Sequence, residues 1–139
     1  MEELRLHPMI VHFPIGLFIT ALGFEAASLI ARKESWHETA RRIFAVAVIS
    51  CGLAALTGLW EAWRIHLNHP VLNRHRFFAL TTLAVSILGW FISEQLLKKK
   101  SNKAREVFLI FLCLIVVGII LTSFFGGEMV YEYGVGVAP

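Results

Sequence analysis

Three ionisable side chains fall within or at the edge of long apolar stretches, and their chemistry makes them candidates for a site. They are His12, Glu61 and His75. An ionisable group in a membrane is costly unless it is paired or solvated, so its presence there suggests a function. Imidazole nitrogens and carboxylate oxygens bind iron, zinc and copper. The three residues therefore predict either a binding site or a polar contact that fixes neighbouring helices.

Helical periodicity places each of these residues at the head of a stripe of small side chains. The stripes are His12, Gly16, Thr20, Gly23 and Ala27; Glu61, Thr57, Ala54 and Ser50; and His75, Ala79, Thr82, Ser86, Gly89 and Ser93. Helices in membranes pack through small residues, because lipid provides no hydrophobic drive between helices. We therefore expect all three stripes to face the interior of a bundle, with the ionisable groups at a similar depth.

Four apolar runs supply the helices that must position these residues. The runs span roughly residues 9–31, 43–63, 77–97 and 107–125. Each has about 20 residues, the length that an α-helix needs to cross roughly 30 Å of hydrocarbon. The hydrophobic fraction of 57% also exceeds that of soluble domains. The sequence predicts one all-α integral membrane domain over residues 1–139, an up-down bundle of four transmembrane helices.

The distribution of basic residues predicts how the bundle is oriented. Nine of the thirteen Lys and Arg residues lie in the connections after the first and third runs. Cytoplasmic connections are enriched in Lys and Arg, so we expect both termini and the second connection on the outer side. Five of the six histidines, all except His37, then lie near the outer face. The net charge of +3 follows this membrane pattern and does not indicate nucleic acid binding.

The C-terminal residues 126–139 are richer in glycine and polar side chains than the apolar runs are. We expect Gly126 and Gly127 to end the fourth helix. The residues that follow would then fold across the outer end of the bundle as a cap. This cap would bring Glu128 and Tyr131 toward the histidines.

Other chemistries find little support in the sequence. It contains no C-x-x-C, no H-E-x-x-H, no Gly-rich phosphate loop and no nucleophile elbow. Cys51 and Cys113 lie in apolar runs, where cysteine usually behaves as a small hydrophobic residue. Glu25 and Glu94 lie near the inner ends of their runs and are expected to reach the surface. His37 falls in a connection, where we expect it to be solvated.

The two ends of the sequence resemble a known family. The segments LHPMIVHFPIGLF at residues 6–18 and GGEMVYEYGVGV at residues 126–137 are similar to the two signatures of a bacterial predicted membrane protein family, domain of unknown function 2231. The resemblance covers essentially the whole chain. It implies four transmembrane helices and a multi-pass location in the bacterial inner (cytoplasmic) membrane.

Two further features of that family bear on the site. Some relatives open the third helix with a histidine–arginine–aromatic triplet, and this chain has His75, Arg76 and Phe77 there. Many relatives carry a histidine where this chain has Tyr133, so that position is not expected to be an essential ligand here. Some relatives are associated with c-type cytochromes, which implies a link to electron transfer.

The preferred interpretation is a membrane protein or subunit that binds a b-type haem and transfers electrons. His12 and His75 lie on helices that are diagonal in an up-down bundle, so they could be the axial ligands of one haem near the outer face. Arg76 could pair with a haem propionate. The partners would then be a periplasmic cytochrome, a quinone or other subunits of a membrane complex, beside the lipid bilayer itself.

Three alternatives stay open. A pathway for protons or small solutes is the weakest, because ionisable groups at one end do not span the membrane. His12, His75 and Glu61, with His7 or Glu128 as further ligands, could bind a metal ion without haem. The same residues could instead stabilise a non-catalytic structural subunit of a larger membrane complex, since buried polar groups are usually hydrogen-bonded. The sequence leaves open whether the chain is an enzyme, and it favours an electron carrier or an accessory subunit.

Overall fold

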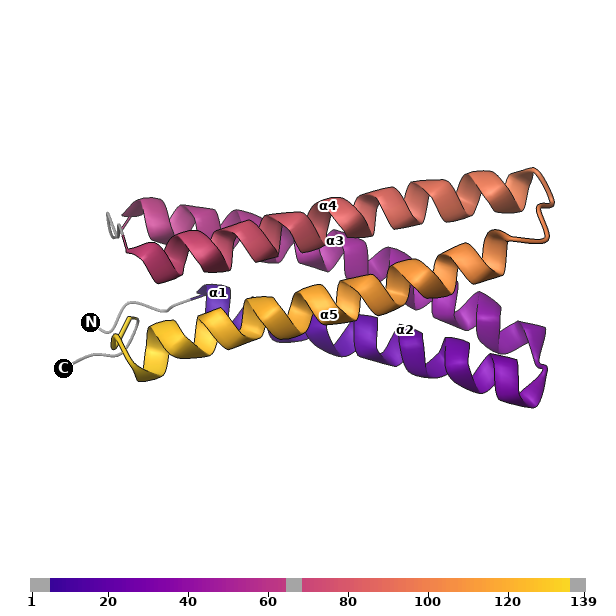
Figure 1. Cartoon of the computed structure of the whole chain (residues 1–139), viewed down its shortest axis with the longest axis horizontal. Helices are drawn as coiled ribbons and strands as arrows, with labels where there is room; N and C mark the ends of the chain where they lie inside the picture. The colour runs from indigo at the N-terminus through magenta and orange to yellow at the C-terminus, as the bar shows by residue number, and fades with distance from the viewer. Residues whose placement is uncertain (1–5, 65–68, 136–139) are drawn as a thin grey trace.

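The computed structural model describes residues 6–64 and 69–135, and this part of the chain is helical apart from short turns (Figure 1). The helices are α1 (Leu6–Ile10), α2 (His12–Ala31), α3 (Glu34–Arg64), α4 (Pro70–Lys98) and α5 (Ala104–Tyr131). Four segments are long and apolar enough to cross a membrane, and α1 and α2 together form the first of them. The prediction of an all-helical chain with four membrane-spanning segments is therefore confirmed.

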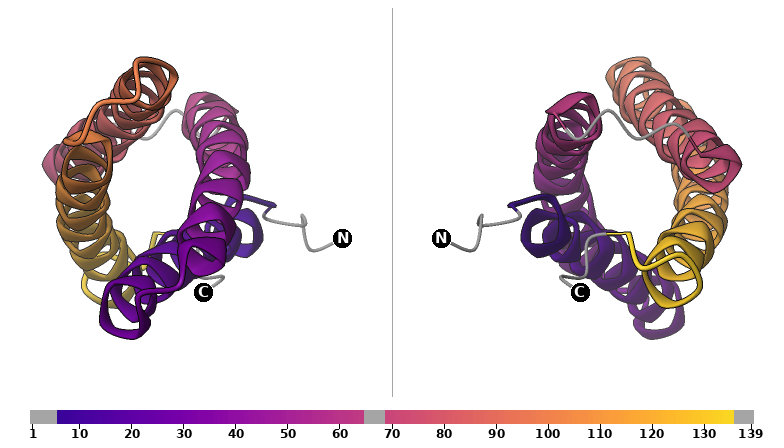
Figure 2. Two further views of the ribbon diagram at one scale, coloured as in Figure 1. Left: turned by 90° about the vertical axis from the view of Figure 1, so that its right-hand side faces the viewer. Right: turned by 90° about the vertical axis from the view of Figure 1, so that its left-hand side faces the viewer.

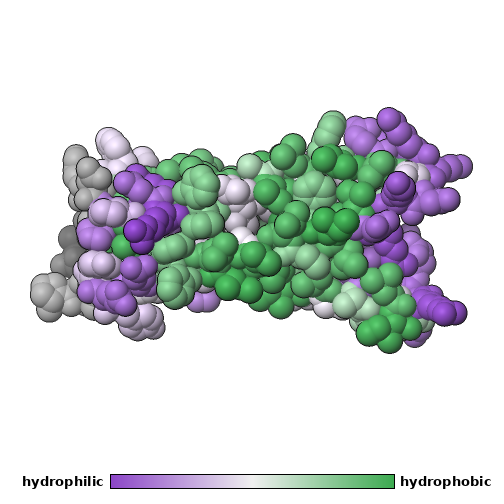
Figure 3. All heavy atoms as spheres, viewed as in Figure 1, coloured by the Kyte–Doolittle hydropathy of each residue, from purple (hydrophilic) through white to green (hydrophobic). Residues whose placement is uncertain are grey.

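The helices run up and down, so that the bundle has two distinct ends (Figure 1). We call the end formed by Ala31–Glu34 and Lys98–Ala104 the basic end. The opposite end is called the terminal end, because the described chain begins there at Leu6 and finishes there at Val135. A belt of apolar side chains covers the surface between these two more polar ends (Figure 3). This distribution is what a lipid-facing bundle requires.

Very short turns at the basic end produce two helical hairpins. Arg32 adopts a left-handed conformation with φ of 54°, and its backbone N–H donates to the Ser28 carbonyl. Only Arg32 and Lys33 separate α2 from α3, so these helices must run antiparallel in close contact. The α2–α3 hairpin and the α4–α5 hairpin lie on opposite sides of the bundle (Figure 2). Contacts within each hairpin outnumber those between the hairpins.

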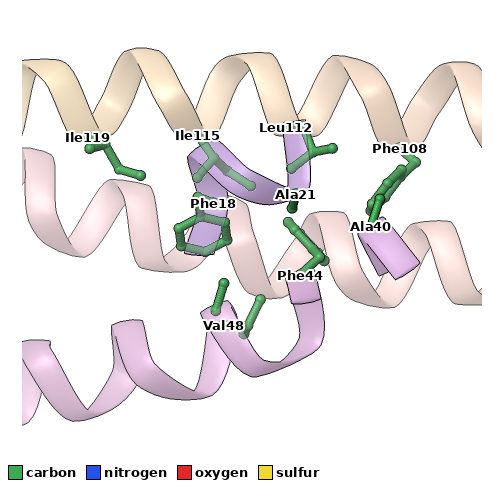
Figure 4. Close-up of a cluster of buried hydrophobic side chains, with 10 residues drawn as sticks. Phe18, Ala21, Ala40, Phe44, Val48, Phe108, Leu112, Ile115 and Ile119 are labelled. Atoms are coloured by element: carbon green, nitrogen blue, oxygen red, sulfur yellow. The ribbon is translucent and has the colours of Figure 1, made fainter. Parts of the chain in front are cut away.

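A buried apolar cluster joins the hairpins from the middle of the bundle toward the basic end (Figure 4). Its aromatic members are Phe18, Phe44 and Phe108 from α2, α3 and α5, and each is at most 2% exposed. The Phe44 ring lies edge-on to both of the others, with centroids 5.6 Å and 5.2 Å away. Ring contacts of this geometry add to the packing that holds membrane helices together.

The helix of the first membrane-spanning segment is interrupted at Val11. Pro14 has no N–H to donate to the carbonyl of Ile10, and its ring crowds that carbonyl. The His12 side chain also reaches back to the Pro8 carbonyl, with a distance of 2.7 Å from Nδ1 to the oxygen. α1, like α2, packs against α3.

The helices extend beyond the apolar runs, and the predicted end of the last helix is wrong. α5 continues through Gly126 and Gly127 to Tyr131. The glycine that leaves the helix is Gly134, with φ of +61°, and the backbone N–H of Val135 donates to the Met129 carbonyl. Gly126 instead serves packing, because a Cβ there would lie 3.4 Å from the His75 ring.

The proposed C-terminal cap is described only as far as Val135, since residues 136–139 lie outside the described part of the chain. The ring of Tyr133 lies against the ring of His69, with centroids 4.4 Å apart. His69 precedes α4, and its side chain accepts a hydrogen bond from the backbone N–H of Val71. The segment after α5 therefore packs against the start of α4, and a covering role over the cavity stays a prediction.

Candidate functional site

A small cavity lies between the four spans in the half of the bundle near the terminal end. Its volume is about 80 Å³, and its walls are mostly apolar. The lining includes small residues from every span, such as Pro14, Ala54, Ala79 and Thr122, together with the rings of two histidines and the thiol of Cys51. The histidines are His7 and His75, so the site differs from the predicted one in one residue.

His7 reaches the cavity from α1 and is held by α3. Its backbone N–H donates to Glu61 Oε1 at 2.8 Å. Its ring nitrogen Nδ1 lies 2.9 Å from the Ala54 carbonyl oxygen and 3.4 Å from Thr57 Oγ1. The ring lies directly over Gly58, where a Cβ would be only 2.8 Å from the imidazole. The missing side chain at Gly58 is what allows the ring to lie so close to α3.

His75 reaches the same cavity from α4 and is held by α5. Its Nδ1 lies 3.0 Å from the carbonyl oxygen of Thr122. The centroids of the His7 and His75 rings are 6.2 Å apart, and the two ring planes are nearly perpendicular at 84°. The two hairpins thus each contribute one imidazole to the cavity, as was predicted for His75.

The hydrogen bonds of the two histidines define which ring nitrogen is available. A carbonyl oxygen only accepts hydrogen bonds, so Nδ1 of each ring carries the proton that it donates. Nε2 of His7 and of His75 therefore keeps its lone pair. Histidines that bind metals show this same arrangement, in which one nitrogen donates to a carbonyl and the other coordinates the metal.

The structure places His12 away from the cavity, so the prediction that it faces inward is wrong. Its side chain is exposed, and its Nδ1 is paired with the Pro8 carbonyl of the same helix turn. Gly16, Thr20 and Gly23 of its stripe are exposed as well. The buried face of α2 consists of Pro14, Phe18, Ala21, Glu25 and Ser28. The bulky Phe18 fills the interior on this helix, and the small residues face outward.

The inward stripes predicted on the other two helices agree with the structure. Thr82, Ser86, Gly89 and Ser93 are buried on α4. Ala54 is buried on α3, and Thr57 and Glu61 are partly buried. Glu61 contacts His7 through its backbone amide rather than His12. Among the described residues, no three His, Cys, Asp or Glu side chains come close enough to hold one metal ion, so the predicted set of His12, His75 and Glu61 is not assembled.

Arg76 follows His75 and is only partly buried as a residue. Its Nε atom, however, is buried and finds no hydrogen-bond partner within the described ranges. An unpaired buried donor is unfavourable, because it has lost water without gaining an acceptor. This arginine therefore has a donor for which the described residues supply no acceptor.

Sequence reasoning missed a buried charged cluster at the basic end. Glu25 is fully buried, and its carboxylate accepts hydrogen bonds from His37 Nδ1 at 2.6 Å and from Arg105 Nε at 2.9 Å. Arg105 also donates to Ser28 Oγ and lies 3.5 Å from Glu34. Glu25 and His37 were expected at the wet surface. The sequence did contain a signal for this cluster, because acidic and basic residues lie at a similar depth near the ends of three helices.

The fold and the site define the class of protein: an all-helical, multi-pass membrane protein with a pair of histidines near one end of its bundle. The family model of the predicted membrane proteins called DUF2231 matches residues 3–139. The chain therefore belongs to the DUF2231 family of predicted membrane proteins. No curated protein and no solved structure matches this chain.

Proposed function

We propose that this protein binds a b-type haem through His7 and His75 and transfers electrons. The observation that carries the proposal is the separation of the two rings. With metal–imidazole bonds of about 2.0–2.1 Å, two rings on opposite sides of one metal ion have centroids roughly 6 Å apart. The observed separation is 6.2 Å. His7 takes the place that the sequence suggested for His12.

The number of available ligands favours haem over an isolated metal ion. A haem iron needs only axial ligands from the protein, because the porphyrin supplies the other four nitrogens. A structural zinc ion needs about four protein ligands. Two imidazoles with free Nε2 atoms meet the first requirement, and no third His, Cys, Asp or Glu joins them in the described part of the chain.

The surroundings of the two histidines fit a porphyrin only if the cavity widens. A volume of about 80 Å³ holds a few water molecules and is smaller than the macrocycle. The walls combine small side chains with larger apolar ones, among them Ile15, Phe18 and Ile119. The buried Nε–H of Arg76, which lacks an acceptor, is suited to a propionate.

A bound haem would supply one-electron transfer at this position. The Ala54 and Thr122 carbonyls would fix the orientation and tautomer of the two imidazoles. By the distribution of Lys and Arg, the terminal end lies on the outer side of the bacterial inner membrane, with both termini there. Exchange with a periplasmic cytochrome, a quinone or another subunit of a membrane complex would then be possible.

An absorption spectrum of the protein purified in mild detergent tests this proposal. We expect a Soret band that falls more than tenfold in both His7→Ala and His75→Ala, because each variant removes one axial ligand. His12→Ala is the matched control, and we expect it to keep the band, since its side chain points away from the cavity. A band that is lost in His12→Ala and kept in His7→Ala would contradict the assignment of the ligands.

A metal ion without porphyrin is the second candidate, and the small volume of the cavity favours it. About 80 Å³ is enough for one ion and its remaining water ligands between the two Nε2 atoms. Soft, low-coordinate ions such as Cu(I) accept imidazole ligands. A colourless protein that retains metal through dialysis would support this candidate. A colourless, metal-free protein from cells able to supply both would leave a structural subunit as the function.

A further inference from the structure

We propose that the two hairpins are held together at the basic end and separate at the terminal end, so that a ligand enters the cavity through the seam between α2 and α5. Only the identity of that ligand rests on the proposed function. The inference itself rests on where charged contacts between the hairpins lie and on how the spans are connected.

The α2–α5 seam is closed at the basic end by the buried Glu25 carboxylate. Glu25 belongs to α2 and Arg105 to α5, and their side chains are paired at 2.9 Å. Glu25 also accepts from His37 of α3, so one carboxylate joins three helices. A charge pair withdrawn from water is costly to break, because separation leaves a buried charge without a partner.

The α3–α4 seam is closed at the same end by a second ion pair. Arg41 of α3 and Glu94 of α4 lie 2.5 Å apart and are each about two-thirds buried. Each seam between the hairpins therefore has an ion pair at the basic end, and Arg105 of α5 adds a contact of 3.5 Å with Glu34 of α3 there. The aromatic cluster of Phe18, Phe44 and Phe108 adds apolar contact between the hairpins in the adjoining part of the bundle.

The terminal end is joined differently. Arg64 aside, the ion pairs that cross between hairpins in the described ranges lie at the basic end. Near the terminal end the hairpins meet around the cavity, where the centroids of the His7 and His75 rings are 6.2 Å apart. Separation of the hairpins around the cavity therefore breaks none of these three ion pairs.

Chain connectivity selects the seam that opens. Residues 65–69 connect α3 to α4 at the terminal end, so these two helices cannot move far apart there. α2 and α5 have no such connection at that end. The helix interruption at Val11 also lies beside the cavity, and it is the point about which the segment carrying His7 would move. The α2–α5 seam is consequently the side through which a ligand larger than the cavity enters.

Distance measurements between spin labels test this inference. One pair is placed at the terminal end of the seam, on the exposed residues Phe13 and Phe124, and the other at the basic end, on Ile30 and Glu106. Both native cysteines are first replaced with alanine in the full-length chain. We expect the distance distribution of the terminal pair to be roughly twofold wider than that of the basic pair before any ligand is added. Equal widths, or a wider basic pair, would overturn the inference.

Addition of hemin gives a second measurement on the same samples. We expect it to shift and narrow the distribution of the terminal pair and to leave that of the basic pair unchanged. A double variant, Glu94→Gln with Arg105→Met, should broaden the distribution at the basic end, because it removes both charged contacts between the hairpins. An unchanged basic-end distribution in this variant would show that the ion pairs do not hold the hairpins there.

The outcomes separate the two proposals. A wider distance distribution for the terminal pair, with no response to hemin and no Soret band, would overturn haem binding and support opening at the terminal end. Equal widths in a protein that does bind haem through His7 and His75 would overturn the opening and support haem binding. Neither result depends on the other, because the first measurement is made without a ligand.

Discussion

The two ends of this bundle contain different kinds of buried polar group. At the basic end, both oxygens of the Glu25 carboxylate have a partner, in His37 and Arg105. At the terminal end, His7 and His75 each use one ring nitrogen and leave the other free, and the buried Nε of Arg76 has no partner within the described ranges. Buried polar groups in folded proteins are normally satisfied. Unpartnered buried atoms also occur toward the basic end, at Arg41 Nε and Ser93 Oγ, so the two ends differ mainly in the kind of group that they bury. The basic end buries a paired carboxylate, and the terminal end brings two imidazoles to a cavity.

The difference extends to packing. The buried rings of Phe18, Phe44 and Phe108 fill the interior next to the charged cluster, and the cavity begins where such rings stop. Membrane helices gain little from hydrophobic burial, so close packing and polar contacts supply much of their association. The basic end has both kinds of contact, whereas part of the interior near the terminal end is the cavity.

The largest effect on the free energy of unfolding is expected at the basic end, from Glu25→Ala. Removal of one partner from a buried charged cluster typically costs about 3–5 kcal/mol. We expect about 3 kcal/mol here, because Arg105 keeps its contact with Glu34. The measurement is reversible unfolding in mixed micelles, followed by the loss of helical circular dichroism as the denaturing detergent is increased.

The matched control for Glu25→Ala is Glu38→Ala. Glu38 pairs with Arg42 at 3.8 Å on the exposed surface of α3, in a pair of the kind that contributes little. Glu38→Ala should therefore leave the free energy of unfolding almost unchanged. Equal effects of the two substitutions would show that the buried cluster does not stabilise the basic end.

Much of the fold could be predicted from the sequence, because membrane spans are long and their apolar character is strong. The four runs and the inward faces of α3 and α4 follow from length, hydropathy and the spacing of small residues. The turns at the basic end are shorter than these runs suggested, because the helices extend beyond the apolar stretches. The extent of α5 could not be predicted, since Gly126 and Gly127 are typical of helix ends. Here Gly126 lets α5 approach the His75 ring and stays helical.

The site could be predicted only in part, and the error lies on one helix. The rule that small residues face inward holds where a partner helix packs closely, as Phe111 does over Gly89. On α2 the interior is filled by Phe18, so the stripe of His12, Gly16 and Gly23 faces outward. His7 was predicted only as a further metal ligand near the outer face, whereas the structure places it in α1, against α3 and at the cavity.

A smaller effect is expected from alanine at glycines with different surroundings. A Cβ at Gly89 would lie 2.7 Å from the Phe111 ring, whereas a Cβ at Gly16 has no atom within 4 Å. We expect Gly89→Ala to destabilise the protein by about 1–3 kcal/mol through overpacking between α4 and α5. Gly16→Ala should be neutral or slightly stabilising, by up to about 1 kcal/mol, because alanine favours a helix.

The same unfolding titration measures both glycine variants. If Gly16→Ala proved as damaging as Gly89→Ala, the outward face of α2 would have to be covered by protein rather than lipid. That outcome would show that the outward face of α2, which the described chain leaves exposed, is packed against protein.

The smallest effect on stability, and the most specific one on the site, is expected from Gly58→Ala. A Cβ at Gly58 would lie 2.8 Å from the His7 ring, so the imidazole must move. The ring belongs to the short helix α1, which has no buried residues, and it can move without disturbing the core. We expect the free energy of unfolding to change by less than about 1 kcal/mol, since alanine also favours the helix.

The readout for Gly58→Ala is the imidazole signal of His7 in a carbon–proton NMR spectrum, with Gly52→Ala as the control on the same helix. A Cβ at Gly52 has no atom within 4 Å, so that variant should leave the signal unchanged. We expect Gly58→Ala to shift the His7 signal and to reduce haem occupancy several-fold, because the ring leaves its position opposite His75. An unshifted His7 signal would mean that the ring is not seated on Gly58, and the spacing of the two imidazoles would then no longer support a shared ligand. A shifted signal with no loss of stability would show that the terminal end positions its histidines through a contact that the rest of the bundle does not need.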